Sequence, residues 1–447
     1  MTDGPAAPVT SSFRTLKGMH DVLPPDSARR RALVKQFARM ASAAGYGEVI
    51  PPLLEELGVF LRVGEATDVV TKEMYDFVDK DGSRIALRPE ITAGVVRAFV
   101  QHRPTLPWKV WYSGTNFRHE RAQKGRYRMF DQVGVEALGV DDPDLDVEVV
   151  ALAARFFQSL GLTQVELLVN SLGDHDDRAR YTEAVRVYFE SRCDELSEAA
   201  RATLGRNPLR VLDAKRPSDR EVVADAPRIS DYLSESSADH YRRVLQGLDA
   251  VGVAYTESPL LVRGLDYYRR TTFEFAATAL DAAQNAIGGG GRYDGLAEDL
   301  GGPPTDGIGF ALGVDRILLA CDAEGVFPAA PATVDVFVVD VVDGTAARDL
   351  THELRAAGFR ADRRFGGGSM KSQMKSADRS GAVVALIVGE DEAAAGEVSL
   401  RMLDGGGDQR RLSRSGLVAE LGRLLPEVAG DTSTHSHTST DTPRTAT

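Results

Sequence analysis

Two segments of alternating hydrophobic and polar residues, separated by one short basic loop, constrain the fold of this chain most. They are KVWYSGTNFR (109–118) and MFDQVGVEAL (129–138). Alternation with a period of two is typical of a strand with one buried face, and so short a connection makes the two strands antiparallel. Similar patterns occur at SRIALR (83–88) and TTFEF (271–275). Residues 1–330 are therefore predicted to form an α+β domain, with helices packed on one face of an antiparallel sheet.

The rest of the sequence predicts three further parts. Between about residues 172 and 256 the pattern becomes helical with few candidate strands, which indicates a helical insertion into the sheet domain. A proline- and alanine-rich stretch at 327–335 marks a boundary, and the strand–helix alternation after it predicts a smaller α/β domain with parallel strands over 331–426. The Ser/Thr-rich residues 427–447 cannot form a core and are predicted to be disordered.

Composition bounds the environment of the protein. No hydrophobic run approaches the roughly 18 residues that a membrane helix needs, and the N-terminus lacks the pattern of a secretory signal. The two cysteines are too few for a disulfide framework or a cysteine-based zinc site, and His435 and His437 in the tail are too weak a pair to hold a metal. We expect a cytoplasmic protein with no membrane segment and no metal site of its own.

The charge distribution points to an anionic partner. A net charge of −13 by itself argues against nucleic-acid binding, but binding depends on local potential. Residues 117–128 carry five Lys or Arg against one Glu, and residues 359–379 carry six against two Asp. One basic run is usually a solvated face. Two such runs in an acidic chain, both containing Gly and Gln, favour an anionic ligand.

Three arginines, Arg118, Arg263 and Arg316, each accompany a glycine-bearing strand and apolar neighbours. A guanidinium remains charged and is costly to bury without an anion. Arg316 stands near the start of a predicted helix, where the helix dipole disfavours a cation. Because the guanidinium fork matches phosphate geometry, the three arginines predict a polyphosphate site.

A second group of polar residues predicts a pocket for a small zwitterion. Gln132 and Glu136 share one face of their strand, and Gly134 between them leaves room for a ligand. Glu90 and Thr92 lie at the start of a predicted helix. They either cap that helix or face an ammonium group in a cleft, and the residues alone leave both alternatives open.

Two more stretches bear on this pocket. In LVRGLDYYRRTTFEF (261–275) the residues Leu265, Tyr267, Thr271, Phe273 and Phe275 are predicted to share one strand face. Tyr267 and the adjacent Tyr268 would add polar recognition. The glycines of AIGGGGRYDGL (286–296) either form a flexible loop or let the backbone approach a ligand closely.

These motifs together resemble the histidyl-tRNA synthetases, a family of class II aminoacyl-tRNA synthetases. RIALRPEITA resembles the stretch around the family's RPExTA motif, with Ile91 where the family often has glycine. FRHERAQKGRYRMFDQVGVEALG is similar to class II motif 2, and GFALGVDRI to motif 3. LVRGLDYY and GGRYDGL resemble the two histidine-specific motifs, and YGEVIPPLLEE resembles motif 1. Residues 363–392 resemble the anticodon-binding domain, so the resemblance runs from about Lys17 to Leu425.

The resemblance implies the substrates L-histidine, ATP and tRNA(His), with Mg²⁺ accompanying ATP. The histidine carboxylate attacks the α-phosphate of ATP to give histidyl-adenylate and pyrophosphate, and the terminal ribose of the tRNA then takes the histidyl group. Arg263 would be a catalytic residue: it would contact the α-phosphate and the histidine carboxylate and stabilise the charge that grows in the transition state. Arg118 would share the α-phosphate, Arg316 would hold the γ-phosphate, and Glu120 would also lie at the ATP.

The remaining roles are carried over in the same way. Glu90, Thr92 and Gln132 would fix the α-ammonium group of histidine, with Ile91 beside them, and Glu136 and Tyr268 would bond the imidazole nitrogens, with Tyr267 alongside. The acceptor end of the tRNA would meet Arg121 and Gln123. Pro52 stands in the place of the family's dimer-interface proline, which implies a homodimer.

Three alternatives remain open on the sequence. Synthetase-like chains serve as regulatory subunits of the histidine-biosynthetic ATP phosphoribosyltransferase, but such chains usually lose the ATP arginines and the anticodon domain. A related synthetase for threonine, proline or glycine is disfavoured by LVRGLDYY and by the Gln132 and Glu136 pair. A kinase-linked sensor of uncharged tRNA is disfavoured because the chain has no kinase motifs.

Overall fold

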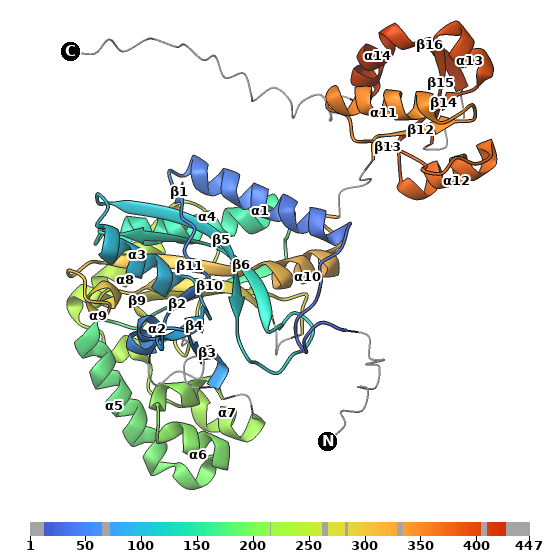
Figure 1. The fold of residues 1–447 in the computed structure, drawn as a ribbon. Coiled ribbons are helices and arrows are strands. Elements are labelled where there is room, and N and C mark those ends of the chain that lie inside the picture. The colour runs from blue at the N-terminus through green and yellow to red at the C-terminus, as the bar shows by residue number, and fades with distance from the viewer. Residues whose placement is uncertain are drawn as a thin grey trace, which may run out of the picture. The chain divides into compact units, whose positions relative to one another are not determined.

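The structure is a computed structural model of the chain, and it describes residues 13–64, 72–214, 216–261, 267–281, 285–328, 334–403 and 409–425. The chain divides after Pro328 into two compact units, coloured blue to amber and amber to red in Figure 1. None of the described helices is long and apolar enough to cross a membrane. The tail predicted to be disordered, residues 427–447, lies outside the described residues.

The first unit is built on an eight-stranded sheet, as the alternating segments predict. Its strand order is β1-β5-β6-β11-β10-β9-β7-β8. Neighbouring strands are antiparallel except in the two edge pairs, β1 with β5 and β7 with β8, which are parallel. The strands are β1 Gly47–Glu48, β5 Trp108–Phe117, β6 Met129–Leu138, β7 Val165–Ser171, β8 Thr256–Glu257, β9 Arg269–Ala277, β10 Ala286–Arg292 and β11 Gly307–Gly313.

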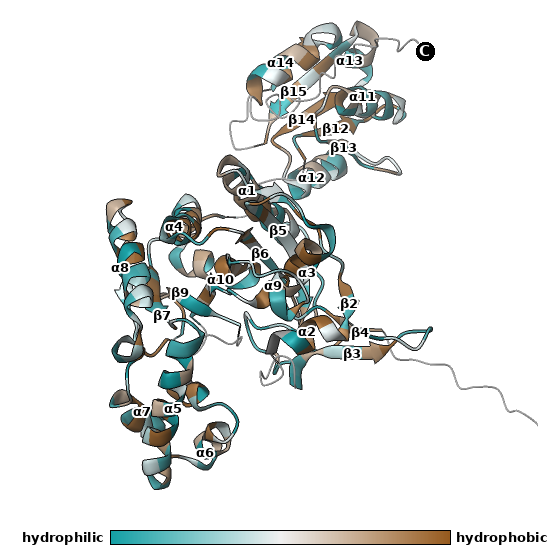
Figure 2. Ribbon diagram, turned by 90° about the vertical axis from the view of Figure 1, so that its left-hand side faces the viewer, coloured by the Kyte–Doolittle hydropathy of each residue, from teal (hydrophilic) through white to brown (hydrophobic). Residues whose placement is uncertain are grey.

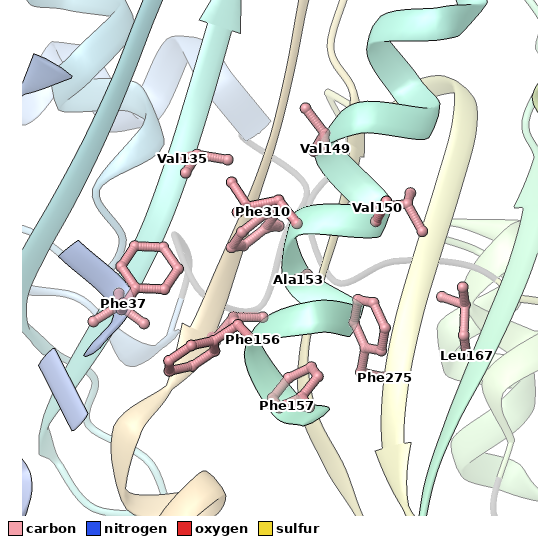
Figure 3. Packing of buried hydrophobic residues seen from close by; sticks show 14 of the residues in the cluster. Phe37, Val135, Val149, Val150, Ala153, Phe156, Phe157, Leu167, Phe275 and Phe310 are labelled. Atoms are coloured by element: carbon pink, nitrogen blue, oxygen red, sulfur yellow. The ribbon is translucent and has the colours of Figure 1, made fainter. Parts of the chain in front are cut away.

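Helices cover one face of this sheet and bury its apolar side chains. They are α1 Asp26–Ala43, α4 Pro143–Ser159, α8 Glu235–Ala250 and α10 Val314–Glu324. Two aromatic residues of α4 pack in this core: the ring of Phe156 lies 5.1 Å from that of Phe37 on α1, and the ring of Phe157 lies 5.0 Å from that of Phe275 on β9 (Figure 3). Burial of such rings supplies much of the hydrophobic stabilisation of the unit. The opposite face of the sheet is left for polar residues.

A second, three-stranded sheet stands on the polar side. Its order is β2-β4-β3, with β2 Leu54–Glu56, β3 Tyr75–Val78 and β4 Arg84–Leu87. The strand predicted at SRIALR therefore exists, but its assignment to the main sheet is wrong, because a four-residue alternating pattern does not specify its partner. Three helices pack beside it: α2 Leu57–Gly64, α3 Thr92–His102 and α9 Leu296–Asp299. Their apolar residues form a cluster that also takes in Tyr267, Tyr268 and Tyr293.

The strand predicted from residue 261 is shorter than expected. The strand β9 begins at Arg269, and Arg270 has a left-handed backbone with φ 48°. This conformation breaks the alternation, so Tyr267 does not share a face with Phe273 and Phe275, which lie in the core under the helices. Leu265 lies outside the described residues.

Between β7 and β8 the described elements are helical and mostly form a core of their own. They are α5 His175–Ser191, α6 Glu198–Leu204 and α7 Pro217–Ala224, the 3₁₀ turns Cys193–Glu195, Pro208–Asp213 and Ile229–Tyr232, and α8. The side chains of Tyr181, Val185, Phe189 and Ile229 meet in this core. Asp174 and Asp177 form a reciprocal capping box that fixes the start of α5 close to the end of β7.

The second unit is an α/β sandwich around a five-stranded sheet of order β13-β12-β14-β15-β16. The first three strands are parallel, as predicted, but β15 and β16 are antiparallel. The connections into these two strands are too short for a parallel crossover. β12 and β14 are buried along their whole length, and Figure 2 shows them mostly in brown, the colour of hydrophobic residues. The elements are β12 Val336–Asp340, α11 Thr345–Ala356, β13 Ala361–Arg363, α12 Met370–Ser380, β14 Val384–Val388, α13 Glu390–Ala395, β15 Glu397–Met402, β16 Gln409–Ser413, the 3₁₀ turn Arg414–Gly416 and α14 Leu417–Leu424.

Candidate active site

The polar row predicted on β6 lies on the sheet face that the helices leave open. Val133 and Val135 point into the core under the helices, so Gln132, Gly134 and Glu136 point the opposite way. A Cβ atom at Gly134 would overlap the hydroxyl of Tyr112 and a backbone oxygen of the neighbouring strand. Glycine at this position therefore lets Tyr112 reach across β6 towards Glu136.

Glu136 is the centre of a buried hydrogen-bond network. Its side chain has no exposed area. Its Oε1 accepts hydrogen bonds from the hydroxyls of Thr92 at 2.7 Å and Tyr112 at 3.1 Å. Its Oε2 accepts one from the hydroxyl of Tyr293 at 2.6 Å. Hydroxyl groups from three separate parts of the fold thus converge on one carboxyl group. Gly309, its partner on the neighbouring strand β11, leaves the space that the carboxyl group fills.

The environment of Glu136 favours the protonated carboxyl group. Burial raises the pKa of Glu136 to about 8, and the nearby carboxylate of Glu90 adds to the rise. The hydrogen bonds from Tyr293, Thr92 and Tyr112 oppose that rise, because they stabilise the ionised form. A carboxyl group whose pKa lies so close to neutral pH can both accept and donate a hydrogen bond, which suits recognition of a ring with two nitrogens.

Glu90 caps the helix, the first of the two alternatives that the sequence left open, and one of its oxygens is left over. α3 begins at Thr92, and one oxygen of Glu90 accepts a hydrogen bond from the backbone nitrogen of Ala93 at 2.9 Å, so it caps the helix. The other oxygen, Oε2, is buried and has no partner among the described residues. Burial raises the pKa of Glu90, against the effect of Arg118 nearby. Thr92 turns to Glu136, while the side chain of Ile91 packs with Val95 and Tyr112 in a hydrophobic cluster.

Three tyrosine rings pack together on the side of α9. Tyr267 and Tyr268 are both buried, with ring centroids 4.7 Å apart, and the Tyr293 ring is 6.0 Å from that of Tyr267. Burial raises the pKa of Tyr267 well above its usual range, so its hydroxyl stays protonated. From the helical segment, Arg178 donates a hydrogen bond to the backbone oxygen of Tyr268 at 3.1 Å.

The glycines at 288–291 do not form a flexible loop, which was one of the two alternatives left open by the sequence. They belong to the buried strand β10, between β9 and β11. A Cβ atom at Gly290 would overlap the backbone of β11, so glycine allows these strands to approach closely. The strand ends in Arg292, which is fully buried and paired with Asp146 at 2.7 Å. Tyr293, the next residue, is thereby held over Glu136.

Three site residues were not predicted from the sequence: Tyr112, Asn116 and Tyr293. Tyr112 and Asn116 share the parity of Arg118 along β5, so the alternation rule that selected Gln132 and Glu136 would have selected them too. The side-chain nitrogen of Asn116 donates a hydrogen bond to Oε1 of Gln132 at 2.7 Å. Tyr293 is separated from Glu136 by 157 residues, and no local pattern could pair them.

Two of the three predicted arginines, Arg118 and Arg316, lie beside the loop that joins β5 to β6. Arg118 follows β5; its Nε donates to the backbone oxygen of Pro89 at 2.9 Å, and its guanidinium lies 5.3 Å from the ring centre of Phe130. Glu120 pairs closely with Arg126 and lies 3.9 Å from Arg118. This single carboxylate is shared between two guanidinium groups, so the positive charge of the loop is only partly neutralised.

Arg316, on α10, faces the same loop. Its guanidinium donates hydrogen bonds to the backbone oxygens of Gly125 and Ala286. Burial lowers the pKa of Arg316, and repulsion from Arg126 and Arg118 lowers it further. Arg118, Arg126 and Arg316 are thus close enough for their charges to repel. Three guanidinium groups in one region would suit a polyphosphate.

The other predicted residues lie as follows. Arg121 and Gln123 are exposed on the loop between β5 and β6. Pro52 is exposed just before β2. Arg263 lies outside the described residues. Across the described parts of the chain, no group of three or more His, Cys, Asp or Glu side chains could hold a metal ion.

Comparisons with known proteins match most of the chain. The family model described as histidyl-tRNA synthetase matches residues 18–317, and the anticodon binding domain matches residues 335–424. The histidine–tRNA ligase of Rhodococcus erythropolis is 49% identical over 421 residues, which cover 93% of this chain and 99% of that protein. That of Nocardia farcinica is 50% identical, with 92% and 98% covered. The crystal structure of apo S. aureus histidyl-tRNA synthetase superposes with a TM-score of 0.77 at 36% identity, covering 92% of this chain and 100% of that chain.

Proposed function

The chain belongs to the histidyl-tRNA synthetase family, and we propose that the buried cluster around Glu136 is its histidine site. As a histidine–tRNA ligase it joins histidine to tRNA(His) at the expense of ATP. The observation that carries the proposed site is the convergence of Thr92, Tyr112 and Tyr293 on one buried carboxyl group. A site built to hydrogen-bond the two imidazole nitrogens rejects side chains that lack them, because its buried polar groups would then be left unpaired.

Within that site the two ends of histidine are recognised separately. Glu136 and Tyr268 bond the imidazole nitrogens, with Tyr267 beside the ring. The α-ammonium group is held by Glu90, Thr92 and Gln132, and Ile91 supports the site from the core. The unpartnered oxygen of Glu90 supports this assignment, since an ammonium group would supply the missing donor.

ATP binds beside histidine, against the guanidinium groups of Arg118 and Arg316 and with Glu120 nearby. The histidine carboxylate oxygen attacks the α-phosphorus, a new O–P bond forms, and the bond to the β-phosphate oxygen breaks to release pyrophosphate. Arg118 and Arg263 stabilise the charge at the α-phosphate, and Arg316 holds the γ-phosphate. Fixed cations in a partly dry site lower the barrier by stabilising charge that develops there.

Mg²⁺ would reach this site on the phosphates of ATP and would neutralise part of their charge. The described residues offer no carboxylate cluster as a ready cage. Mg²⁺ in nucleotide sites commonly keeps several waters and binds mainly through phosphate oxygens. We therefore assign it no ligand from this chain.

The tRNA meets the chain at both units. A hydroxyl of its terminal ribose attacks the carbonyl carbon of histidyl-adenylate, an ester bond forms, and AMP leaves. Arg121 and Gln123, exposed on the loop at the arginine cluster, meet the acceptor end. In the second unit the basic run 359–379 spans β13 and most of α12, and Phe365, between these two elements, is 70% exposed, with Arg363 4.6 Å from its ring centre. An exposed aromatic ring beside guanidinium groups suits an unpaired base and its phosphate.

We also propose a cytoplasmic homodimer. Ile50 is 80% exposed, and Pro52, Leu53 and Leu54 beside it are exposed as well. A continuous apolar edge of this kind supports contact with a second copy through the motif 1 segment. The mass in solution, against 48.3 kDa for one chain, tests it.

The regulatory-subunit alternative is not favoured. The curated relatives are named histidine–tRNA ligases, and the resemblance to them extends through the second unit. Arg118 and Arg316 are both retained at the site.

ATP–pyrophosphate exchange dependent on the amino acid tests the proposed site. Histidine should support exchange, whereas threonine, proline and glycine should not. Arg263→Ala should abolish most of it, with Arg14→Ala near the N-terminus as a control of equal charge change. Exchange that is independent of the amino acid, or retained in full by Arg263→Ala, would contradict the assignment.

A further inference from the structure

Asn116 is a buried polar residue to which neither the sequence motifs nor the proposed reaction assigns a role. It lies on β5, on the face that also carries Tyr112 and Arg118, and its side chain has no exposed area. Its Nδ2 donates a hydrogen bond to Oε1 of Gln132 on the neighbouring strand at 2.7 Å. Its Oδ1 is buried and receives no hydrogen bond from any described residue.

The half-satisfied amide of Asn116 argues against a purely structural role. A buried acceptor without a donor costs free energy, and an apolar side chain of similar size would avoid that cost. The single bond that Asn116 makes goes to Gln132, which is only partly buried and belongs to the proposed ammonium site. We therefore expect Asn116 to orient the side chain of Gln132 more than to stabilise the fold.

The unpartnered oxygen of Glu90 belongs to the same region. The backbone nitrogen of Phe117 donates to the oxygen of Arg88 at 3.0 Å, and Nε of Arg118 donates to the oxygen of Pro89 at 2.9 Å. Residues 88–90 thus run alongside residues 116–118. The hydrogen bond from Asn116 and the unpartnered oxygen of Glu90 therefore lie on adjoining segments.

We propose that Asn116 is a positioning residue for the α-ammonium group of histidine and acts through Gln132. Its Nδ2 fixes which end of the Gln132 amide carries the oxygen. The second lone pair of that oxygen then accepts from the ammonium group, while Oε2 of Glu90 accepts another of its hydrogens. Without Asn116 the Gln132 amide can turn its nitrogen towards the ammonium group and repel it. This inference rests on the proposed histidine site.

The experiment is a double-mutant cycle with Asn116→Leu, Gln132→Met and the pair, read by ATP–pyrophosphate exchange. Asn116→Leu should raise the KM for histidine about tenfold and leave the KM for ATP within about twofold. In the Gln132→Met background it should add nothing, because the group that it orients is already gone. Thermal unfolding of each variant checks the fold, and Asn116→Ala replaces Asn116→Leu if the latter does not fold.

A ligand without the amine separates positioning from general damage to the pocket. Inhibition of exchange by 3-(imidazol-4-yl)propanoate, which lacks the ammonium group, should be the same for the wild type and Asn116→Leu. An unchanged KM for histidine, an equal rise in both KM values, weaker inhibition by the analogue, or a full further effect in the Gln132→Met background would each overturn the inference. Absence of histidine-dependent exchange in the wild type would instead refute the proposed function.

Discussion

Replacing Glu136 by glutamine should change how the stability of the protein depends on pH. The carboxyl group is fully buried and receives three hydroxyl hydrogen bonds, and its pKa is raised to about 8 from an ordinary value of 4.5. Between these two values the folded protein keeps a proton that the unfolded chain has lost. The free energy of unfolding therefore falls as pH rises through this window. Glutamine has nearly the same shape but does not titrate, so the variant lacks this fall.

The size of the effect follows from the single proton involved. One proton difference between the folded and unfolded states changes the unfolding free energy by about 1.4 kcal/mol per pH unit. Other titrating groups contribute equally to both proteins and cancel in the comparison. From pH 5.5 to 7.5, Glu136→Gln should therefore gain about 2–3 kcal/mol of stability relative to the wild type. Above the folded pKa the difference should level off.

Urea unfolding followed by tryptophan fluorescence measures this difference directly. Both tryptophans, Trp108 and Trp111, lie on β5 beside β6, so their signal reports the sheet that carries Glu136. Glu56→Gln, at an exposed position of β2, is the matched control and should follow the wild type at every pH. If the difference between Glu136→Gln and the wild type stays constant from pH 5.5 to 8.5, the carboxyl group is ionised throughout and the reasoning from burial is wrong.

Three further substitutions test the site. Tyr293→Phe removes the hydroxyl group that donates a hydrogen bond to Oε2 of Glu136. The KM for histidine in pyrophosphate exchange should therefore rise about tenfold, while the KM for ATP stays unchanged. An equal rise in both KM values would point to general disruption. Arg316→Gln should raise the KM for ATP more than tenfold and leave the KM for histidine nearly unchanged, because the charge near the γ-phosphate is lost; an unaltered KM for ATP would exclude this role. Phe365→Ala should raise the KM for tRNA in aminoacylation by roughly tenfold without affecting pyrophosphate exchange, because only base stacking in the second unit is lost. Val342→Ala, at another exposed apolar position of that unit, is the control.

Local patterns predicted the parts of this structure that depend on neighbours in sequence. The alternation at 109–118 and 129–138 predicted the β5–β6 hairpin, and it placed Gln132 and Glu136 on the open face. It did not predict the break at Arg270, because an arginine with φ 48° has no sequence signal. Nor could it assign SRIALR to the smaller sheet, since a short strand is paired by its surroundings.

Contacts between distant segments account for the rest of the site. The Tyr293 hydroxyl reaches Glu136 only because Arg292 is anchored by Asp146 on α4, and that pair links residues 146 positions apart. The glycine run at 288–291 could not be told from a flexible loop by its sequence, yet it forms strand β10, where a Cβ atom at Gly290 would overlap the backbone of β11. In both cases the residue type pointed to a structural role, but the segment that it contacts is distant in sequence and could be identified only from the fold.

For Arg316 the structure supplies a physical basis for the prediction made from sequence. An arginine near the start of α10 opposes the helix dipole, which predicted an anionic partner. The structure gives its guanidinium two backbone oxygens, of Gly125 and Ala286, and these orient the group without neutralising it. Its nearby charges include Arg118 and Arg126, which repel it, and Glu120, which Arg126 already binds. The cation is thus held in place by neutral acceptors beside groups of the same sign, an unfavourable arrangement that the proposed polyphosphate ligand would relieve.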